Sequence, residues 1–150
     1  MRSVSPIVEH IILSAGALVF FVMVVITFNS IQAEMLKDDM NNRLTNLANQ
    51  VALRVVKAYE AGRILEELSP DEPVARLYLD LPTSIAGYPY VIRASDGKIT
   101  AASKIQSVEV ELLGLERDFS LEGKIVGSIT RKPAVSYYKS RNLVILENIG

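Results

Sequence analysis

Few side chains in this sequence have the types and spacing that catalysis or metal binding requires. Adjacent acids occur at Glu66–Glu67 and Asp71–Glu72, but adjacent side chains do not face one common point, so we interpret them as solvated acids rather than an acid/base pair. His10 is the single histidine and there is no cysteine, so no metal-ligand cluster is expected. Phosphate-binding, hydrolase and dinucleotide motifs are also missing. The sequence therefore predicts a protein that is not an enzyme, with no catalytic residue, no metal and no cofactor.

Glu9 is the acid with an unusual position, because it lies at the mouth of an uncharged apolar run, Ile11 to Phe28. A charge in hydrocarbon costs about 2.5–3.5 kcal/mol unless it is paired or reaches the headgroups. Two interpretations stay open. Glu9 docks a neighbouring subunit by binding its α-amino group, or it marks the membrane interface in the first turn of a helix, where the helix dipole favours an anion. Pro6 fits a helix start at this point.

The run from Ile11 to Phe28 is the element that positions Glu9. Its length is close to the ~20 apolar residues that a helix needs to cross ~30 Å of hydrocarbon, so we interpret it as a transmembrane segment. Cleavage as a secretory signal after Ile31-Gln32-Ala33 is an alternative, but the run is longer than the ~7–15 residues usual for such signals. Arg2 on one side and Lys37 and Arg43 on the other specify the orientation only weakly.

Composition limits the partners of the rest of the chain. The 150 residues include 16 Lys and Arg and 17 Asp and Glu, for a net charge of -1. A nucleic-acid partner is not expected, because no basic field is present to attract one. After the apolar segment, about one modest soluble domain remains.

The residues that follow the apolar run predict an amphipathic helix. No Gly or Pro occurs from 34 to 59, and apolar side chains recur in steps of three and four: Leu36, Met40, Leu44, Leu47, Val51, Val55 and Ala58. Gly62 is expected to end the helix as a left-handed cap. Because nothing before residue 34 breaks a helix strongly, both segments are expected to form one rod of about 55 residues, ~80 Å long.

The C-terminal part has the shorter period of β-strands. After a loop at 69–73, runs rich in β-branched and aromatic residues predict about six strands, at 74–81, 88–94, 98–102, 108–113, 124–130 and 142–146. Asp96-Gly97 predicts a hairpin, whereas Tyr137-Tyr138, with basic residues on both sides, is interpreted as a solvated loop. The expected fold class is α+β, a long N-terminal helix packed on a small antiparallel β-sheet or β-sandwich. Its parts are 1–10 (leader and helix start), 11–33 (transmembrane or filament-core helix), 34–62 (amphipathic helix) and 63–150 (β-rich head).

Two stretches resemble a known family. Arg2-Ser3-Val4-Ser5-Pro6 before an apolar run is similar to the start of archaeal type IV pilins and pilin-like proteins, which carry a class III signal peptide, and LPTSIAGYPYV at 81–91 is similar to a passage in such envelope proteins. The resemblance implies a type IV pilin-like fold and cleavage between Ser3 and Val4 by a prepilin peptidase on the cytoplasmic side.

The resemblance also implies a place and partners for the protein. It favours a single-pass membrane protein with a cytoplasmic N-terminus and an extracytoplasmic head, which is then incorporated into a surface filament. The implied partners are the prepilin peptidase, membrane lipid, and copies of the chain or other pilin-like subunits, docked through Glu9. Two alternatives remain: an anchored accessory or stator protein of a pilus or archaellum machine, and an anchored extracytoplasmic ligand-binding domain.

Overall fold

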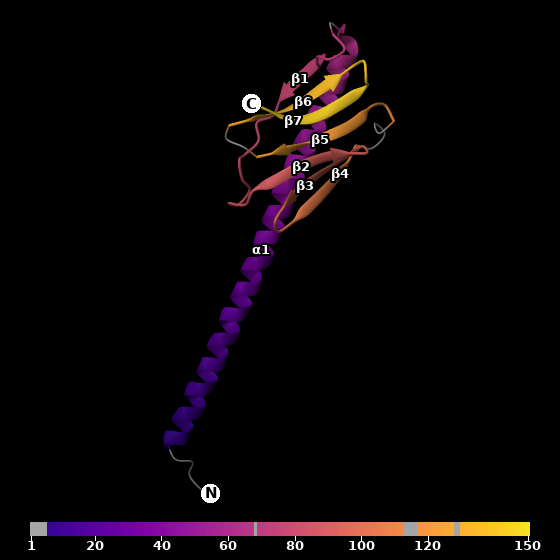
Figure 1. Cartoon of the computed structure of the whole chain (residues 1–150). Helices are drawn as coiled ribbons and strands as arrows, with labels where there is room; N and C mark the ends of the chain where they lie inside the picture. Colours follow the sequence, from indigo (N-terminus) through magenta and orange to yellow (C-terminus); the bar gives the residue numbers. More distant parts are fainter. Residues whose placement is uncertain (1–5, 68, 113–116, 128–129) are drawn as a thin grey trace. The chain divides into compact units, whose positions relative to one another are not determined.

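The described part of the chain forms one long helix followed by a β-sheet. The computed structural model describes residues 6–67, 69–112, 117–127 and 130–150. Figure 1 shows the order of the elements along the chain, which are α1 (Pro6–Ile64), β1 (Ala75–Tyr78), β2 (Tyr90–Ser95), β3 (Lys98–Ser103), β4 (Ser107–Glu111), β5 (Ser120–Val126), β6 (Lys132–Tyr138) and β7 (Leu143–Ile149).

The chain divides into two compact units, and the boundary falls inside α1. The first unit is Met1–Asp38 and contains the N-terminal part of the helix. The second unit, Asp39–Gly150, contains the rest of α1 and the sheet, and is called the head below. The α+β class is therefore confirmed, and so is a helix that continues from the apolar run into the amphipathic segment.

The strands of the head belong to a single sheet rather than to a sandwich. Their order is β1-β6-β7-β5-β2-β3-β4, and neighbouring strands are antiparallel except for the pair β5 and β7. In the sequence β6 comes between β5 and β7, and in the sheet it pairs with the edge of β7 that faces away from β5. Because the chain reverses direction between β6 and β7, β7 runs in the same direction as β5. The expected antiparallel sheet is thus found with one parallel pair.

The second half of α1 covers one face of this sheet (Figure 1). Its buried residues recur in steps of three and four: Met40, Leu44, Leu47, Val51, Val55 and Ala58, with Ala48, Ala52 and Gly62 beside them. The opposing side chains alternate along the strands, as in β2, where Tyr90 and Ile92 are buried and Arg93 is exposed. The predicted apolar stripe is confirmed from Met40 onward, whereas Leu36 is exposed.

Gly62 does not end the helix, and the prediction of a left-handed cap there was wrong. α1 continues to Ile64, and Gly62 is buried within its last turns. A Cβ atom at this position would lie 2.2 Å from Cδ1 of Tyr137. Glycine is therefore required because the ring of Tyr137 packs directly against the helix backbone.

The hairpin predicted at Asp96-Gly97 is confirmed, and a second tight turn lies in the 81–91 stretch. Asp96 and Gly97 both have positive φ, 50° and 73°, and connect β2 to β3 in the geometry of a primed hairpin turn. In the 81–91 stretch, Ile85 and Tyr88 exchange two backbone hydrogen bonds of 2.9 Å. The hydroxyl of the buried Tyr90 donates to the carbonyl of Pro82. Tyr90 is therefore a core residue that ties this connection to the sheet.

The segment around Tyr137-Tyr138 is a strand, so its prediction as a solvated loop was wrong. It forms β6, which lies between β1 and β7, and Tyr137 is only 3% exposed. Lys132, Pro133 and Ser136 interrupt the apolar pattern that signals a strand. β5 also begins at Ser120 rather than at residue 124, because the polar side chains and glycine of its first half hide its alternation.

The turn between β6 and β7 closes the C-terminal end of α1. The Lys139 ammonium donates to the carbonyls of Arg63, at 3.2 Å, and Leu65, at 2.7 Å. The last carbonyls of a helix lack partners within it, and a cation is favoured at this end of the helix dipole. Lys139 therefore caps α1.

The exposed acids near the end of the helix support the same turn. Glu67 accepts a hydrogen bond from the backbone N–H of Ser140 at 3.2 Å, and Asp71 forms an ion pair with Arg141 at 3.2 Å. Their exposure agrees with solvated acids. Their partners show that they also fasten the loop after α1 to the sheet.

Candidate membrane-spanning and subunit-docking segment

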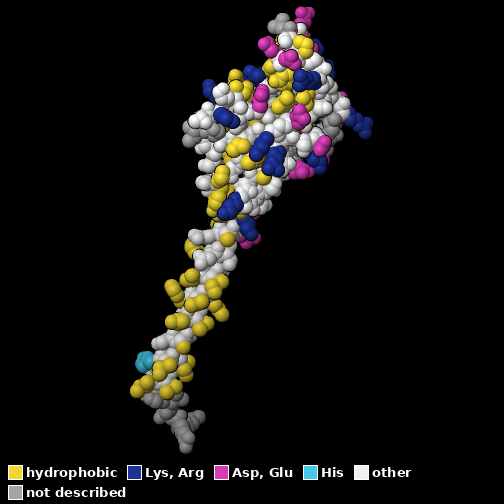
Figure 2. All heavy atoms as spheres, viewed as in Figure 1, with side chains coloured by type: hydrophobic (Ala, Val, Ile, Leu, Met, Phe, Trp, Pro, Cys, Tyr) yellow, Lys and Arg dark blue, Asp and Glu magenta, His cyan; other side chains and the backbone are white. Residues whose placement is uncertain are grey.

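The apolar run at 11–28 is helical and exposed throughout. Among its large hydrophobic side chains, the exposed fraction runs from 41% at Val25 to 70% at Phe20. Figure 2 shows these side chains covering the N-terminal part of α1. The 18-residue window that meets the length and composition of a membrane span has no buried residue. α1 is therefore one helix that is long and apolar enough to be a single membrane span.

Two hydroxyl groups at the end of this run are satisfied within the helix. The hydroxyl of Thr27 donates to the carbonyl of Met23 at 2.9 Å, and that of Ser30 donates to the carbonyl of Ile26 at 3.0 Å. Such bonds allow hydroxyl side chains to enter hydrocarbon without an unpaired donor. The uncharged stretch then extends from 11 to 33, about 23 residues or ~35 Å. That length crosses ~30 Å of hydrocarbon with a modest tilt.

One side of the run carries a shallow apolar groove of about 400 Å³. Its lining residues are spaced three, four and seven apart, so they form one helical stripe: Phe20, Met23, Val24, Thr27, Phe28 and Ile31. Grooves of this kind accept the ridge of side chains on another helix.

Glu9 lies in the first turn of α1, and Pro6 is the first residue of the chain that the structure describes. Its side chain is exposed, and within the described residues it has no hydrogen bond or ion pair. The position fits the favourable end of the helix dipole. An exposed carboxylate at this point is also accessible to the amino group of another chain, so both interpretations of Glu9 remain predictions.

The other predicted residues of this region fall into two groups. Ser3 and Val4, the predicted processing site, lie outside the described residues. His10 is exposed on α1, and the described residues contain no cluster of three or more His, Cys, Asp or Glu side chains able to hold a metal ion.

The structure also brings together a set of side chains that the sequence did not single out. Tyr59, Glu60 and Arg63, from the last turns of α1, line a cleft with Asp118, which precedes β5. More than fifty residues separate Arg63 from Asp118 in the sequence. No local pattern relates two such distant positions, so this group is visible only in the folded head.

The chain matches no protein-family model, no curated protein and no solved structure. The resemblance to archaeal pilin-like proteins consequently remains a prediction based on residues 2–9 and 81–91.

Proposed function

We propose that the chain is a type IV pilin-like structural subunit of an archaeal surface filament, held in the membrane by the N-terminal part of α1 before assembly. The observation that carries this proposal is the contrast in burial along α1. Every residue of the apolar run is exposed, whereas from Met40 onward one apolar stripe of the same helix is buried against the sheet. The helix thus serves the core of its own head in one part and needs an external apolar environment in the other.

Lipid and neighbouring subunits are both suitable environments for the exposed part. Moving an apolar helix from lipid into a helical bundle is roughly neutral in hydrophobic free energy, so side-chain packing and polar contacts direct the exchange. The groove at Phe20–Ile31 supplies a surface for packing. Glu9 supplies the polar contact, since its carboxylate would pair with the α-amino group of an incoming subunit.

Processing by a prepilin peptidase tests the proposal directly. Co-expression of the full chain with an active peptidase is expected to give a mature protein that begins at Val4, as read by N-terminal sequencing and intact mass. Ser3→Gly should be cut at the same bond, Ser3→Phe should remain uncut, and an inactive peptidase should leave all three chains intact. An uncut wild-type chain with the active enzyme, or a chain that begins at Glu34, would contradict the pilin-like assignment.

Incorporation into filaments separates a structural subunit from an anchored accessory protein. A structural subunit is recovered in bulk with purified filaments, whereas an accessory protein stays with the membrane. Glu9→Gln is expected to be processed normally and to lower incorporation at least about tenfold, because losing one partner of a desolvated charge pair costs about 2–5 kcal/mol. Glu34→Gln, at the other end of the uncharged stretch, is the matched control. Equal incorporation of both variants would refute the docking role of Glu9.

A further inference from the structure

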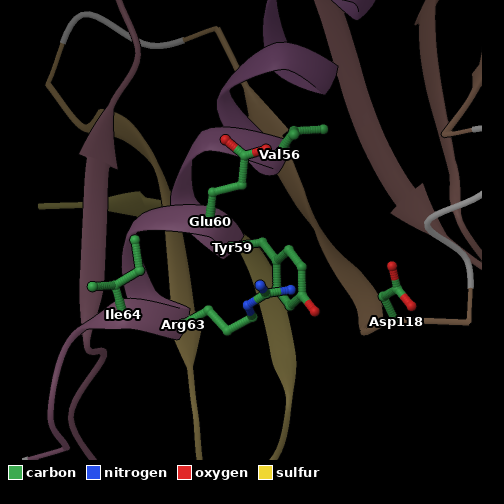
Figure 3. A pocket seen from close by; sticks show the side chains of 6 residues that line it. All are labelled: Val56, Tyr59, Glu60, Arg63, Ile64 and Asp118. Carbon is green, nitrogen blue, oxygen red and sulfur yellow. The ribbon is translucent and has the colours of Figure 1, made fainter.

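The head has a half-open cleft of about 420 Å³ beside the last turns of α1. Figure 3 shows its lining side chains, which are Val56, Tyr59, Glu60, Arg63, Ile64 and Asp118. The volume lies within the ~300–1,000 Å³ typical of small-molecule sites. The membrane and docking roles proposed for α1 leave these residues unused.

One wall of the cleft is an aromatic ring held in a fixed position. Tyr59 packs against Phe119 with ring centroids 4.7 Å apart, and against Tyr137 in an edge-to-face contact at 5.5 Å. Such pairs add about 0.5–1.5 kcal/mol beyond the area that they bury. The Tyr59 hydroxyl points toward the side of the cleft where Asp118 lies (Figure 3), and it has no hydrogen-bond partner in the part of the chain that the structure describes.

The opposite side of the cleft is fixed through Asn142. The side-chain amide of Asn142 donates to the backbone carbonyl of Asp118, and its carbonyl oxygen accepts from the hydroxyl of Tyr137 at 3.0 Å. The backbone of Asn142 has a positive φ of 46° and accepts from the N–H of Ser120 at 2.9 Å. Asn142 thereby links the backbone of Asp118 to the aromatic group that holds Tyr59, so the Tyr59 ring and the backbone that carries Asp118 are positioned before a ligand arrives.

The charges in the cleft select among ligand classes. Arg63 contributes N–H donors, Glu60 and Asp118 contribute acceptors, and the Tyr59 hydroxyl is able to do both. An anionic ligand would meet two carboxylates, and a cationic ligand would meet the guanidinium. A neutral ring that carries several hydroxyls satisfies donors and acceptors alike, and the part of the Tyr59 ring that lines the cleft offers an aromatic surface for its C–H groups.

From this arrangement we propose that the cleft binds a neutral pyranose, as a free sugar or the terminal residue of a glycan. The binding does not depend on the filament role, because it uses only residues of the head. Because the cleft is open, we expect a pyranose to bind weakly, with a dissociation constant of about 1–10 mM.

Saturation-transfer NMR on the full chain in phospholipid nanodiscs tests this proposal without glycoside detergents, which would compete for the site. The probes are the methyl α-glycosides of glucose, mannose and galactose, each titrated to about ten times the expected dissociation constant. At least one glycoside should receive saturation, strongest on the C–H protons of one ring face. Absence of transfer to all three would overturn the proposal.

Four variants locate the binding. Arg63→Gln and Asp118→Asn should each weaken it at least tenfold, about 1.4 kcal/mol, whereas Tyr59→Phe, which keeps the ring and its packing, should weaken it about threefold. Arg43→Gln, in a separate and smaller cleft, should bind as the wild type does. Near-UV circular dichroism verifies that each variant is folded. Glycoside binding that is unchanged in both Arg63→Gln and Asp118→Asn would overturn the assignment. A cleft that binds tetramethylammonium through Asp118 and does not bind the glycosides would also overturn it.

Discussion

Replacing Gly62 by alanine should destabilise the head, although alanine is the better helix former. Within a helix the exchange favours folding by about 1 kcal/mol. Against this, the new Cβ would lie 2.2 Å from Cδ1 and 2.9 Å from Cε1 of Tyr137. That ring has no free space to enter, because it packs on Tyr59 and its hydroxyl is bonded to Asn142. Overpacking costs about 1–3 kcal/mol, and weakening the aromatic and hydrogen-bonded contacts adds about 1 kcal/mol.

The net expectation is a loss of about 1–3 kcal/mol, which lowers the Tm of the head by roughly 4–12 °C. The chain has no tryptophan, and all six tyrosines lie beyond residue 39. Near-UV circular dichroism of the full chain in detergent therefore reports the unfolding of the head separately from the apolar part of α1.

Ala61→Gly, on the exposed side of the same turn, is the matched control for helix propensity. If propensity alone mattered, the two substitutions would shift the Tm in opposite directions. Steric overlap at Gly62 predicts that both lower it. A Tm for Gly62→Ala above that of the wild type would refute the packing assigned to Tyr137.

Two further predictions concern the closure of α1 and the titration of the core. Lys139→Ala should lower the stability of the head by about 1 kcal/mol, because it uncaps the last carbonyls of α1. Arg141→Ala, which removes an exposed ion pair in the same turn, should change stability by less than about 0.5 kcal/mol, and urea titrations that give equal losses would contradict the capping role. Burial raises the pKa of Tyr90 from 10.0 to about 12, so the unfolded chain releases this proton first and stability is lost as the pH rises from about 10 to 12. Tyr90→Phe should reduce that loss in pH-dependent unfolding, and an unchanged pH profile would show that Tyr90 is not its source.

Much of the fold follows from patterns that are local in the sequence. The period of the apolar residues predicts the helix and its buried stripe from Met40 onward, because a helix with one buried face must repeat that face every three or four residues. Asp96-Gly97 predicts its hairpin, since both positions require positive φ. β6 was missed because its strand pattern is broken by Pro133 and by the buried Ser136. The hydroxyl of Ser136 is satisfied by Arg76 of β1 and Glu147 of β7, the strands on either side of β6.

The candidate segment was predictable for the same reason. An uncharged run with Glu9 at its mouth is defined by consecutive residues, and the structure adds that this run is exposed along its length. The cleft of the head was not predictable, because Arg63 and Asp118 meet only after α1 has packed on the sheet.

The sequence by itself determined the properties that depend on neighbours along the chain: the apolar run, the continuous helix, the hairpin turn and the α+β class. Tertiary structure alone decided the properties that depend on distant side chains. It assigned Gly62 to the contact with Tyr137 rather than to a helix cap, placed β6 inside the sheet, and gathered Tyr59, Arg63 and Asp118 around one cleft. The physical reason is that periodicity and turn conformation are local, whereas the space available to a side chain and the partner of a buried polar group are set by whatever the fold places opposite them.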